Sequence, residues 1–425
     1  MKVIWICNFM LPVIAEALGK KIQNKEGWLA GLADAIDQNA TENEIELILG
    51  FPNPPSEEAI SGKIGRLRYF SYPERGDSLH IYQPETEEAF VSLLPAYEPD
   101  IIHVFGTEFP HALAVMNAAA RLGMEKKVLV GIQGYMTAYA PVYMAGIPDY
   151  VEKRVTFRDW LRKDSLRQQK EKYEKRAVME KKLLEKVWHI TGRTEFDHDT
   201  CRFHESAQYH FMNETLRACF YDGAWNAQSC EKHRIFVSQG NYPIKGAHKA
   251  IEAVAGLVKE YPDIKLVIAG DKITAYETIK DRIKISSYGK YLRELIDQYQ
   301  LQEHVVFTGS LTAQQMKTEF CKANLFLSCA VIENSPNSMG EAMLLGMPVI
   351  ASRVGGVESM LSEEEGYLYD YEDVEGLQDK IRAVFEQPKS ACQKGIRAQK
   401  RARVVHDPVR NYHRLLEIYQ KISEE

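Results

Sequence analysis

The sequence predicts an α/β fold made of two Rossmann-like, doubly wound domains that face each other across a cleft. Short apolar runs rich in Val and Ile recur along the 425 residues, and such runs, bounded by Gly, Pro or polar residues, are typical of strands buried on both faces of a sheet. Longer amphipathic stretches separate most of these runs, which implies parallel sheets joined by helices. A stretch with weak periodicity, residues 192–233, divides the runs into two series and so predicts two domains.

The strands are expected in two sets. The first covers residues 3–7, 45–49, 101–105, 127–132 and 186–190, and the second covers 234–238, 265–270, 304–309, 324–328 and 348–352. We therefore predict an N-terminal domain over residues 1–229, a C-terminal domain over 230–406, and a final amphipathic helix within 407–425. In doubly wound sheets, ligands bind beyond the carboxyl ends of the strands, so the cleft is the expected ligand site.

The composition argues against several classes of protein. With 53 Lys and Arg against 59 Asp and Glu, the formal net charge is −6, which is unfavourable for a general nucleic-acid binder. The 7 Cys are scattered without a C-x-x-C pair, which indicates free thiols in a reducing compartment and no zinc site. The apolar stretch at the N-terminus is interrupted by Asn8, Pro12 and Glu16, so it is a poor candidate for a signal peptide. We expect a cytoplasmic protein.

One segment differs from the rest in charge. Residues 151–188 contain 13 Lys or Arg and 7 Asp or Glu. A long solvated helix pair with charge pairs such as Glu171 with Lys175 is one interpretation. The other is a basic face that contacts anionic lipid headgroups, peripherally at a membrane, or a lipid-linked phosphate substrate.

The most informative stretch is residues 332–356, which lies between two predicted strands. Within it, Ser338–Leu345 should form a helix that Asn337 or Ser338 caps and that Gly346 ends. Its first backbone N–H groups, including those of Met339 and Gly340, would be unpaired. Because the helix dipole also favours negative charge there, the helix start predicts a phosphate site.

Two carboxylates flank this predicted phosphate site. A carboxylate accepts two hydroxyl hydrogen bonds, so Glu333 and Glu341 suit the vicinal diols of a ribose or a hexose. For Glu341 an alternative remains open, because Ser338-x-x-Glu341 also fits a capping box in which the carboxylate bonds its own helix cap. Glu333 precedes Asn-Ser-Pro-Asn in a loop, where no structural task is evident.

These residues resemble a known enzyme family. Glu333-x7-Glu341, with ENSPNS inside it and GEAMLLGMPVIAS after it, looks like the nucleotide-sugar site of glycosyltransferase family 4, whose members are retaining enzymes of the two-lobed GT-B type. The resemblance extends over almost the whole chain, includes members that build capsular or exopolysaccharides, and is more specific in the C-terminal half. Further stretches that carry it are EGWLAGL (26–32), HVFGTEFPHALA (103–114), GIQGYM (131–136), TGRTEFD (191–197), SQGNYPIKG (238–246), YGKYLREL (288–295), FTGSLTAQQM (307–316) and RVGGVE (353–358).

The resemblance implies a role for each of the charged residues. Glu341 would bind the ribose hydroxyls of the donor nucleotide, and Glu333 would contact the transferred sugar near the reacting centre. Lys245, followed by Gly246 at the mouth of a strand-to-helix turn, would neutralise the diphosphate. In this family the leaving phosphate is thought to take the acceptor proton on the same face of the sugar.

Backbone groups would complete the donor site. By resemblance, Asn337, Ser338 and Met339 would donate to the sugar or the distal phosphate, and Gly309 and Ser310 would line the base pocket. The contacts around Gly309–Leu311 and Asp271–Ile273 would decide between UDP-, GDP- and ADP-sugars. Gly27, which opens a predicted helix, would let the chain approach the phosphates or the acceptor, unless it is an ordinary turn glycine.

The sequence departs from the family pattern at several positions. Gly240 stands where many members have an Arg that pairs with the motif Lys, so either Lys245 acts alone or Arg193 or another cation substitutes. Gln133 stands where several members have a His near the sugar, so no general base is supported there. Nearby titratable alternatives are His103, Glu108, His111 and His248, of which any lone His is more often structural. Gln133, Glu108 and Arg193 are our candidates for the acceptor or sugar side.

We therefore predict a retaining hexosyltransferase. It would move a sugar from a nucleotide diphosphate sugar to a saccharide or lipid-linked acceptor, in bacterial surface polysaccharide biosynthesis. The final helix would, by resemblance, pack back on the N-terminal domain. No permanently bound cofactor, metal or nucleic acid is expected. The alternatives are a nucleotide-sugar epimerase of the same fold, a non-catalytic two-lobed sugar-binding protein and a scaffold without donor affinity.

Overall fold

The computed structural model describes residues 1–20, 27–38, 45–200 and 204–425. Glu26, the first residue of the EGWLAGL stretch, and Cys201, one of the seven Cys, lie outside these ranges. The chain divides into two compact units. Unit 1 comprises residues 1–138, 172–216 and 406–425, and unit 2 comprises residues 139–171 and 217–405. No helix among the described residues is both long enough and apolar enough to cross a membrane.

Unit 1 is built on an eight-stranded sheet with the order β3-β4-β2-β1-β5-β6-β7-β8. All neighbouring strands are parallel except β3 and β4. The strands are β1 (Lys2–Ile6), β2 (Glu46–Asn53), β3 (Ser61–Ile64), β4 (Leu67–Pro73), β5 (Ile101–Phe105), β6 (Val128–Gly131), β7 (His189–Gly192) and β8 (Gln208–Phe211).

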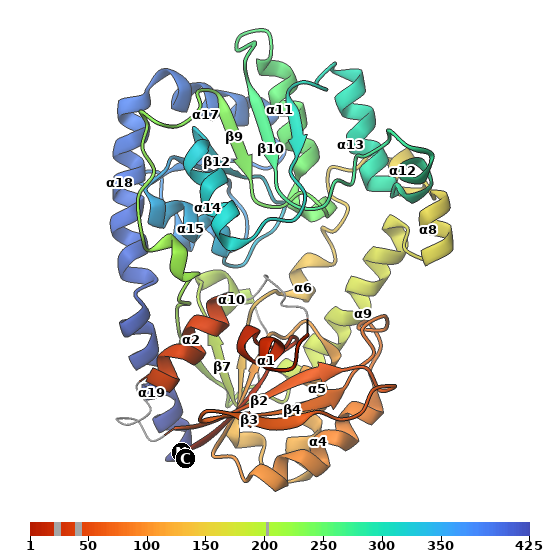
Figure 1. Ribbon diagram of the computed structural model, residues 1–425, viewed down its shortest axis with the longest axis vertical. Helices are drawn as coiled ribbons and strands as arrows, with labels where there is room; N and C mark the ends of the chain where they lie inside the picture. The colour runs from red at the N-terminus through yellow and green to blue at the C-terminus, as the bar shows by residue number, and fades with distance from the viewer. Residues whose placement is uncertain (21–26, 39–44, 201–203) are drawn as a thin grey trace. The chain divides into compact units, whose positions relative to one another are not determined.

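Helices cover both faces of the unit 1 sheet. One buried cluster joins the strands to α4 (Pro84–Tyr97), α5 (Pro110–Arg121) and the second half of α9 (Leu166–Leu184). Figure 1 shows α4 and α5 beside β4. A second cluster joins the strands to α1 (Pro12–Ala17), α2 (Gly27–Gln38) and α19 (Pro408–Ser423). In that cluster the Trp5 indole N–H donates to the Tyr419 hydroxyl at 2.7 Å.

Unit 2 is built on a six-stranded, all-parallel sheet with the order β11-β10-β9-β12-β13-β14. The strands are β9 (Arg234–Val237), β10 (Lys265–Ile268), β11 (Val305–Phe307), β12 (Leu325–Ser328), β13 (Val349–Ser352) and β14 (Tyr367–Tyr369). From β9 the chain proceeds outward to β11 and then returns to β12 on the other side of β9. In doubly wound sheets, ligands bind at such a reversal of strand order, beyond the carboxyl ends of the two central strands.

The helices of unit 2 also form two layers. A buried cluster packs α11 (Ala247–Leu257), α13 (Ser287–Gln298) and α17 (Val374–Glu386) on one face, and Figure 1 shows α11 beside β10. On the other face, Phe320 contacts the rings of Phe220, Phe236 and Phe326. The remaining helices are α7 (Asp149–Glu152), α8 (Phe157–Arg162), α12 (Ile279–Lys284), α14 (Ala313–Lys322), α15 (Asn337–Leu345), α16 (Val357–Met360) and α18 (Pro388–Val405). Short helices α6 (Met136–Tyr139) and α10 (Glu195–Thr200) follow β6 and β7.

The predicted α/β fold with two doubly wound sheets is confirmed, and each predicted strand has a counterpart. Four further strands were not predicted, namely β3, β4, β8 and β14. The units divide the chain at other positions than 229 and 230, because residues 139–171 and 217–229 belong to unit 2. Residues 217–229 are held in unit 2 by Trp225. Its backbone N–H donates to the Leu345 carbonyl, and its indole N–H donates to the Ala323 carbonyl.

Candidate active site

Lys245 and Glu333 meet at the carboxyl end of the unit 2 sheet. Lys245 ends a short 3-10 turn (Pro243–Lys245) that follows β9, and Glu333 follows β12, so the reversal of strand order brings both to the same end of the sheet. The Lys245 ammonium lies 2.5 Å from a carboxylate oxygen of Glu333, with the two side chains 23% and 10% exposed. A cation and a carboxylate are thus held together where a doubly wound sheet binds its ligand.

Gly246 makes the Lys245 turn possible. Its φ is +70°, which L-residues rarely adopt, and a Cβ built on it would lie 1.7 Å from the Cys329 carbonyl oxygen. The turn is tied to the loop after β12 because Val331 donates its N–H to the Ile244 carbonyl at 2.9 Å. Lys245 therefore has a defined position relative to the Glu333 loop.

The backbone of Glu333 is fixed from a third loop. The Gly356 N–H donates to the Glu333 carbonyl at 2.9 Å, and Gly355, at φ +52°, passes so close that a Cβ there would lie 2.1 Å from the same oxygen. The next residue, Asn334, is fully buried and donates its backbone N–H to the Tyr139 hydroxyl oxygen at 3.2 Å. A loop held on both sides presents the Glu333 carboxylate with little freedom.

The start of α15 differs from the prediction. The helix begins at Asn337, Pro336 is its N-cap, and it has no side-chain cap. The N–H groups of Met339 and Gly340 both donate to the Pro336 carbonyl, at 2.9 and 3.3 Å. The expectation that these two groups are unpaired is therefore wrong, because a tight turn at Pro336 satisfies them. Asn337 and Ser338 form the first turn of the helix.

Glu341 is not part of a capping box. Arg217 binds both carboxylate oxygens, with its Nε 2.5 Å from one and its Nη2 2.6 Å from the other. Glu341 is only 2% exposed, and this burial raises the pKa of its carboxyl while Arg217 opposes the rise. The Arg217 guanidinium also lies over the Phe220 ring, 5.0 Å from its centroid. Sequence reasoning missed Arg217, which lies in the stretch without periodicity.

The loops after β10 and β11 also meet at this end of the sheet. Gly309 has φ +87° and accepts the Gly270 N–H at 3.2 Å. The Ser310 hydroxyl donates to Asp271 at 3.3 Å, and the Asn241 amide contacts the other oxygen of Asp271 at 3.5 Å. The side-chain oxygen of Asn241 is buried without a hydrogen-bond partner. These loops therefore offer polar groups with unused hydrogen-bonding capacity.

In unit 1 the predicted residues Gln133 and Arg193 belong to one network. Gln133 donates to Glu214 at 2.6 Å and accepts from Arg193 at 3.2 Å, and Arg193 forms an ion pair with Glu214. The three side chains line a small cavity beyond the ends of β6 and β7, together with the ring of His103. Glu214 was not predicted, since nothing in its surrounding sequence distinguishes it.

The other titratable candidates are buried. Burial raises the pKa of Glu108 in spite of nearby Arg176, and lowers the pKa of His103 and of His248 to about 3. The Nδ1 atom of His111 lies 2.9 Å from a carboxylate oxygen of Glu74. These environments fit structural histidines. Gly27 is the first residue of α2.

Comparison with known proteins identifies most of unit 2. Residues 225–401 match the family described as "Glycosyl transferases group 1". The matched residues include Lys245, Glu333, Glu341, Gly309 and Ser310, while Arg217 lies eight positions before the match.

A curated relative supports the same assignment. The chain is 27% identical over 170 residues to the putative colanic acid biosynthesis glycosyltransferase WcaL of Escherichia coli K12, and the match covers 38% of each chain. The chain spans 28% and 25% of the lengths of two further curated relatives. The similarity of sequence is therefore confined to a part of each protein.

Solved glycosyltransferases share the fold over the full length. Sucrose-phosphate synthase from Thermosynechococcus elongatus has a TM-score of 0.71 at 15% identity, covering 99% of this chain and 98% of that one. Anabaena Alr3699/HepE, solved in complex with UDP and glucose, has a TM-score of 0.64 at 14% identity, covering 99% of this chain and 100% of that one. The likeness extends over both units, so the whole chain shares the GT-B fold of these proteins.

Proposed function

We propose that the protein is a retaining glycosyltransferase that moves a hexose from a nucleotide diphosphate sugar to a saccharide or lipid-linked acceptor in polysaccharide biosynthesis. The observation that carries the proposal is the Lys245–Glu333 pair at the carboxyl end of the unit 2 sheet, within the residues that match the glycosyltransferase family. The complex of Alr3699/HepE with UDP and glucose favours a nucleotide-sugar donor. The relative named for colanic acid biosynthesis favours a polysaccharide pathway.

The charges suit the chemistry of the donor. When the bond between sugar and diphosphate breaks, negative charge grows on the leaving phosphate and positive charge on the sugar ring. Lys245 would exchange its contact with Glu333 for the diphosphate and stabilise the leaving group, because a fixed cation in a partly buried site acts strongly on developing charge. Glu333, freed from Lys245, would accept hydroxyls of the transferred sugar close to the reacting carbon. Ser338 and Asn337 would contact the sugar or the distal phosphate.

Glu341 would bind the ribose hydroxyls with Arg217 in place. A carboxylate has about four acceptor positions, so a bidentate Arg leaves room for two hydroxyl donors. Arg217 would keep the buried carboxylate ionised and correctly oriented. The nucleotide base would lie against Gly309, Ser310 and Asp271, whose polar groups are available for recognition.

We assign no general base. The leaving phosphate would itself take the acceptor proton on the face from which it departs, which gives retention. Gln133 and Arg193 of unit 1 would bind acceptor or sugar hydroxyls, because an amide and a guanidinium hydrogen-bond them without needing to change protonation.

The proposal is tested with substitutions at the central pair. Purified Glu333→Gln and Lys245→Ala proteins should each lose about 10²–10³ in kcat, by analogy with removal of one donor from an oxyanion site. Transfer from each of UDP-, GDP- and ADP-glucose to a saccharide is followed by release of the nucleotide. Lys249→Ala, which removes a neighbouring lysine paired with Glu372, serves as the control and should retain turnover. Near-full turnover of Glu333→Gln would contradict its role.

The nucleotide is identified by a thermal-shift panel. A ligand that binds only the folded protein raises the melting temperature by mass action, so the preferred diphosphate gives the largest shift. Incubation of the donor alone separates the remaining alternatives. An isomerised donor would indicate an epimerase, and binding without any release of nucleotide in the presence of acceptors would indicate a non-catalytic protein.

A further inference from the structure

Unit 2 carries an unusual apolar surface, which we call the α8–α12 surface. It consists of large apolar side chains on or beside two short helices that pack together, α8 and α12. Trp160 is 68% exposed and Ile279 is 77% exposed. The complete set is Val155, Phe157, Trp160, Leu161, Ile279 and Ile283. Single exposed apolar residues need no explanation, but six gathered on two adjacent short helices indicate an interaction surface.

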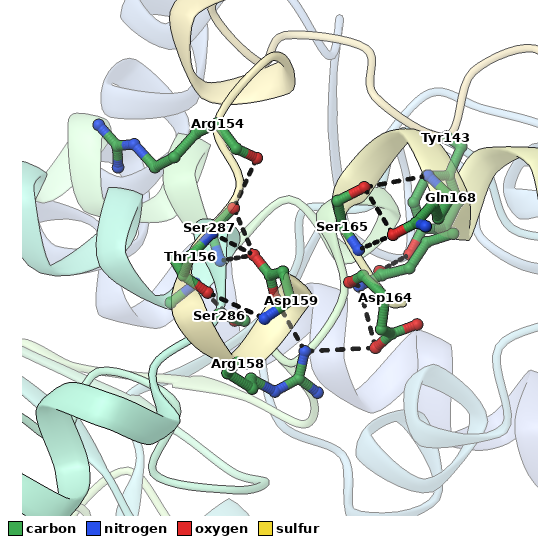
Figure 2. Close-up of polar contacts among 12 residues, drawn as sticks. Tyr143, Arg154, Thr156, Arg158, Asp159, Asp164, Ser165, Gln168, Ser286 and Ser287 are labelled. Carbon is green, nitrogen blue, oxygen red and sulfur yellow. Dashed lines mark hydrogen bonds and ion pairs between the residues drawn. The ribbon is translucent and has the colours of Figure 1, made fainter. Parts of the chain in front are cut away.

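The surface is held firmly by polar contacts beneath it. Figure 2 shows the carboxylate of Asp159, from α8, meeting Ser287 at the start of α13. The Ser287 N–H and hydroxyl donate to Asp159 at 2.9 and 2.5 Å, and Arg158 pairs with it at 3.0 Å. Asp159 is fully buried, and Thr156 caps α8 through a capping box. The helix is therefore anchored on its inner face, while Trp160 and Leu161 remain in solvent.

Positive charge surrounds the apolar residues. Residues 150–170 contain seven Lys or Arg against three Asp or Glu, in a chain whose net charge is −6. One of the three acids is the buried Asp159, and another, Asp164, contacts Arg158. The basic side chains exposed to solvent on and around the two helices are Lys153, Arg162, Lys163, Arg167, Lys280, Arg282 and Lys284.

We propose that the α8–α12 surface docks onto an anionic lipid bilayer. Proteins that bind at the membrane interface combine Trp, Phe and Leu with neighbouring Lys and Arg. The apolar side chains enter the headgroup boundary, and the basic side chains contact anionic lipids. The basic residues have long apolar stems, so they can reach headgroups while the rings insert. The surface includes only the first part of residues 151–188, because residues 172–188 belong to unit 1. There Glu180 of α9 is fully buried and bonded to Thr107 and Thr137.

Vesicle binding tests the proposal without donor or acceptor, so its outcome is independent of the proposed activity. The full chain is sedimented with phosphatidylcholine vesicles and with vesicles that also contain phosphatidylglycerol. We expect binding to the anionic vesicles, reduced by added salt, since exposed charges are screened. Trp160 fluorescence should shift to the blue as its ring leaves water. Trp5 and Trp225, 0% and 9% exposed, are already buried and should contribute little. A variant that lacks Trp160 but keeps the other four Trp shows how much of the shift belongs to Trp160.

Two variants locate the binding. A triple variant, Phe157→Ser, Trp160→Ser and Leu161→Ser, should lower the partition coefficient by at least about 100-fold, given the apolar area withdrawn from the interface. An Arg162→Gln and Lys163→Gln variant should lower it by about fivefold per charge. The matched control replaces two exposed apolar residues of α18, Ile396→Ser and Val404→Ser, and should bind as the parent does. Unchanged thermal melting establishes that each variant is folded.

Three results would overturn the proposal. Equal binding to neutral and anionic vesicles would remove the role of charge. Unchanged binding of the triple variant would place any membrane contact elsewhere. Absence of vesicle binding, together with a parent dimer that the triple variant dissociates in sedimentation analysis, would show that a second copy of the chain covers the surface.

Discussion

At the scale of residues, the ion pair between Arg217 and Glu341 contributes to the stability of the fold. The carboxylate is buried and has lost its water, so its ionised form depends on the guanidinium. Arg217→Ala should destabilise the protein by about 3–5 kcal/mol, because it leaves a buried charge without a partner. The Arg217→Met and Glu341→Gln double variant should recover much of this loss, since neither buried charge remains. Urea unfolding measures both, and an Arg217→Ala protein as stable as the parent contradicts the pairing.

The sequence could identify the acidic partner of this pair but not the basic one. Glu341 stands in a loop-to-helix motif with an evident pattern, whereas Arg217 lies 124 positions away in a stretch without periodicity. The sequence therefore left open whether Glu341 belongs to a capping box. Residue spacing alone does not distinguish a carboxylate that bonds its own helix from one that bonds a distant side chain. Lys245 and Glu333 were both predicted, since each follows a clear strand signal.

At the scale of elements, the turn before α11 depends on one glycine. Gly246→Ala should cost at least about 2 kcal/mol, because a left-handed conformation is strained for Ala and the new Cβ would meet the Cys329 carbonyl at 1.7 Å. Gly223→Ala is the matched control in the same unit. Its φ is +87°, but the nearest atom is the end of Lys317 at 3.5 Å, so only the backbone cost of about 1–2 kcal/mol applies. Thermal unfolding compares the two, and equal losses would contradict the close approach.

Strand prediction succeeded or failed according to burial pattern. Strands such as β5, with all five residues buried, are near-continuous apolar runs and were predicted with the observed bounds. β3 reads Ser-Gly-Lys-Ile and is mostly exposed at the edge of the sheet, and β8 reads Gln-Tyr-His-Phe, so neither has the apolar content that periodicity analysis needs. Pairing with a neighbouring strand, which a local pattern does not encode, makes these segments strands.

At the scale of the whole molecule, buried neutral histidines should set the response to acid. His248 lies between the hydroxyls of Tyr288 and Tyr371, each 3.2 Å away, with Lys249 adjacent, and burial lowers its pKa to about 3. In the unfolded chain a His has a pKa of about 6.5. Between these values the unfolded state binds a proton that the folded state does not. Stability is therefore complete above about pH 6.5 and falls as the pH drops toward 3.

This dependence is checked by urea unfolding at a series of pH values. His248→Gln should flatten the fall in unfolding free energy with acid, whatever its effect on stability at neutral pH. His413→Gln, at an exposed position on α19, should leave the slope unchanged. An unaltered slope in His248→Gln would show that the ring is protonated in the folded state.

The chain passes between the two units four times, after residues 138, 171, 216 and 405. Neither unit is therefore encoded by one continuous stretch of gene. Ile147, Val151 and Leu166 complete the apolar core around β9 and β10, although they precede those strands by many residues. A fragment cut out at the family match would leave these partners behind and expose the side chains they cover. Dissection of this protein into its two units must follow the course of the polypeptide through both of them, because no single cut separates them.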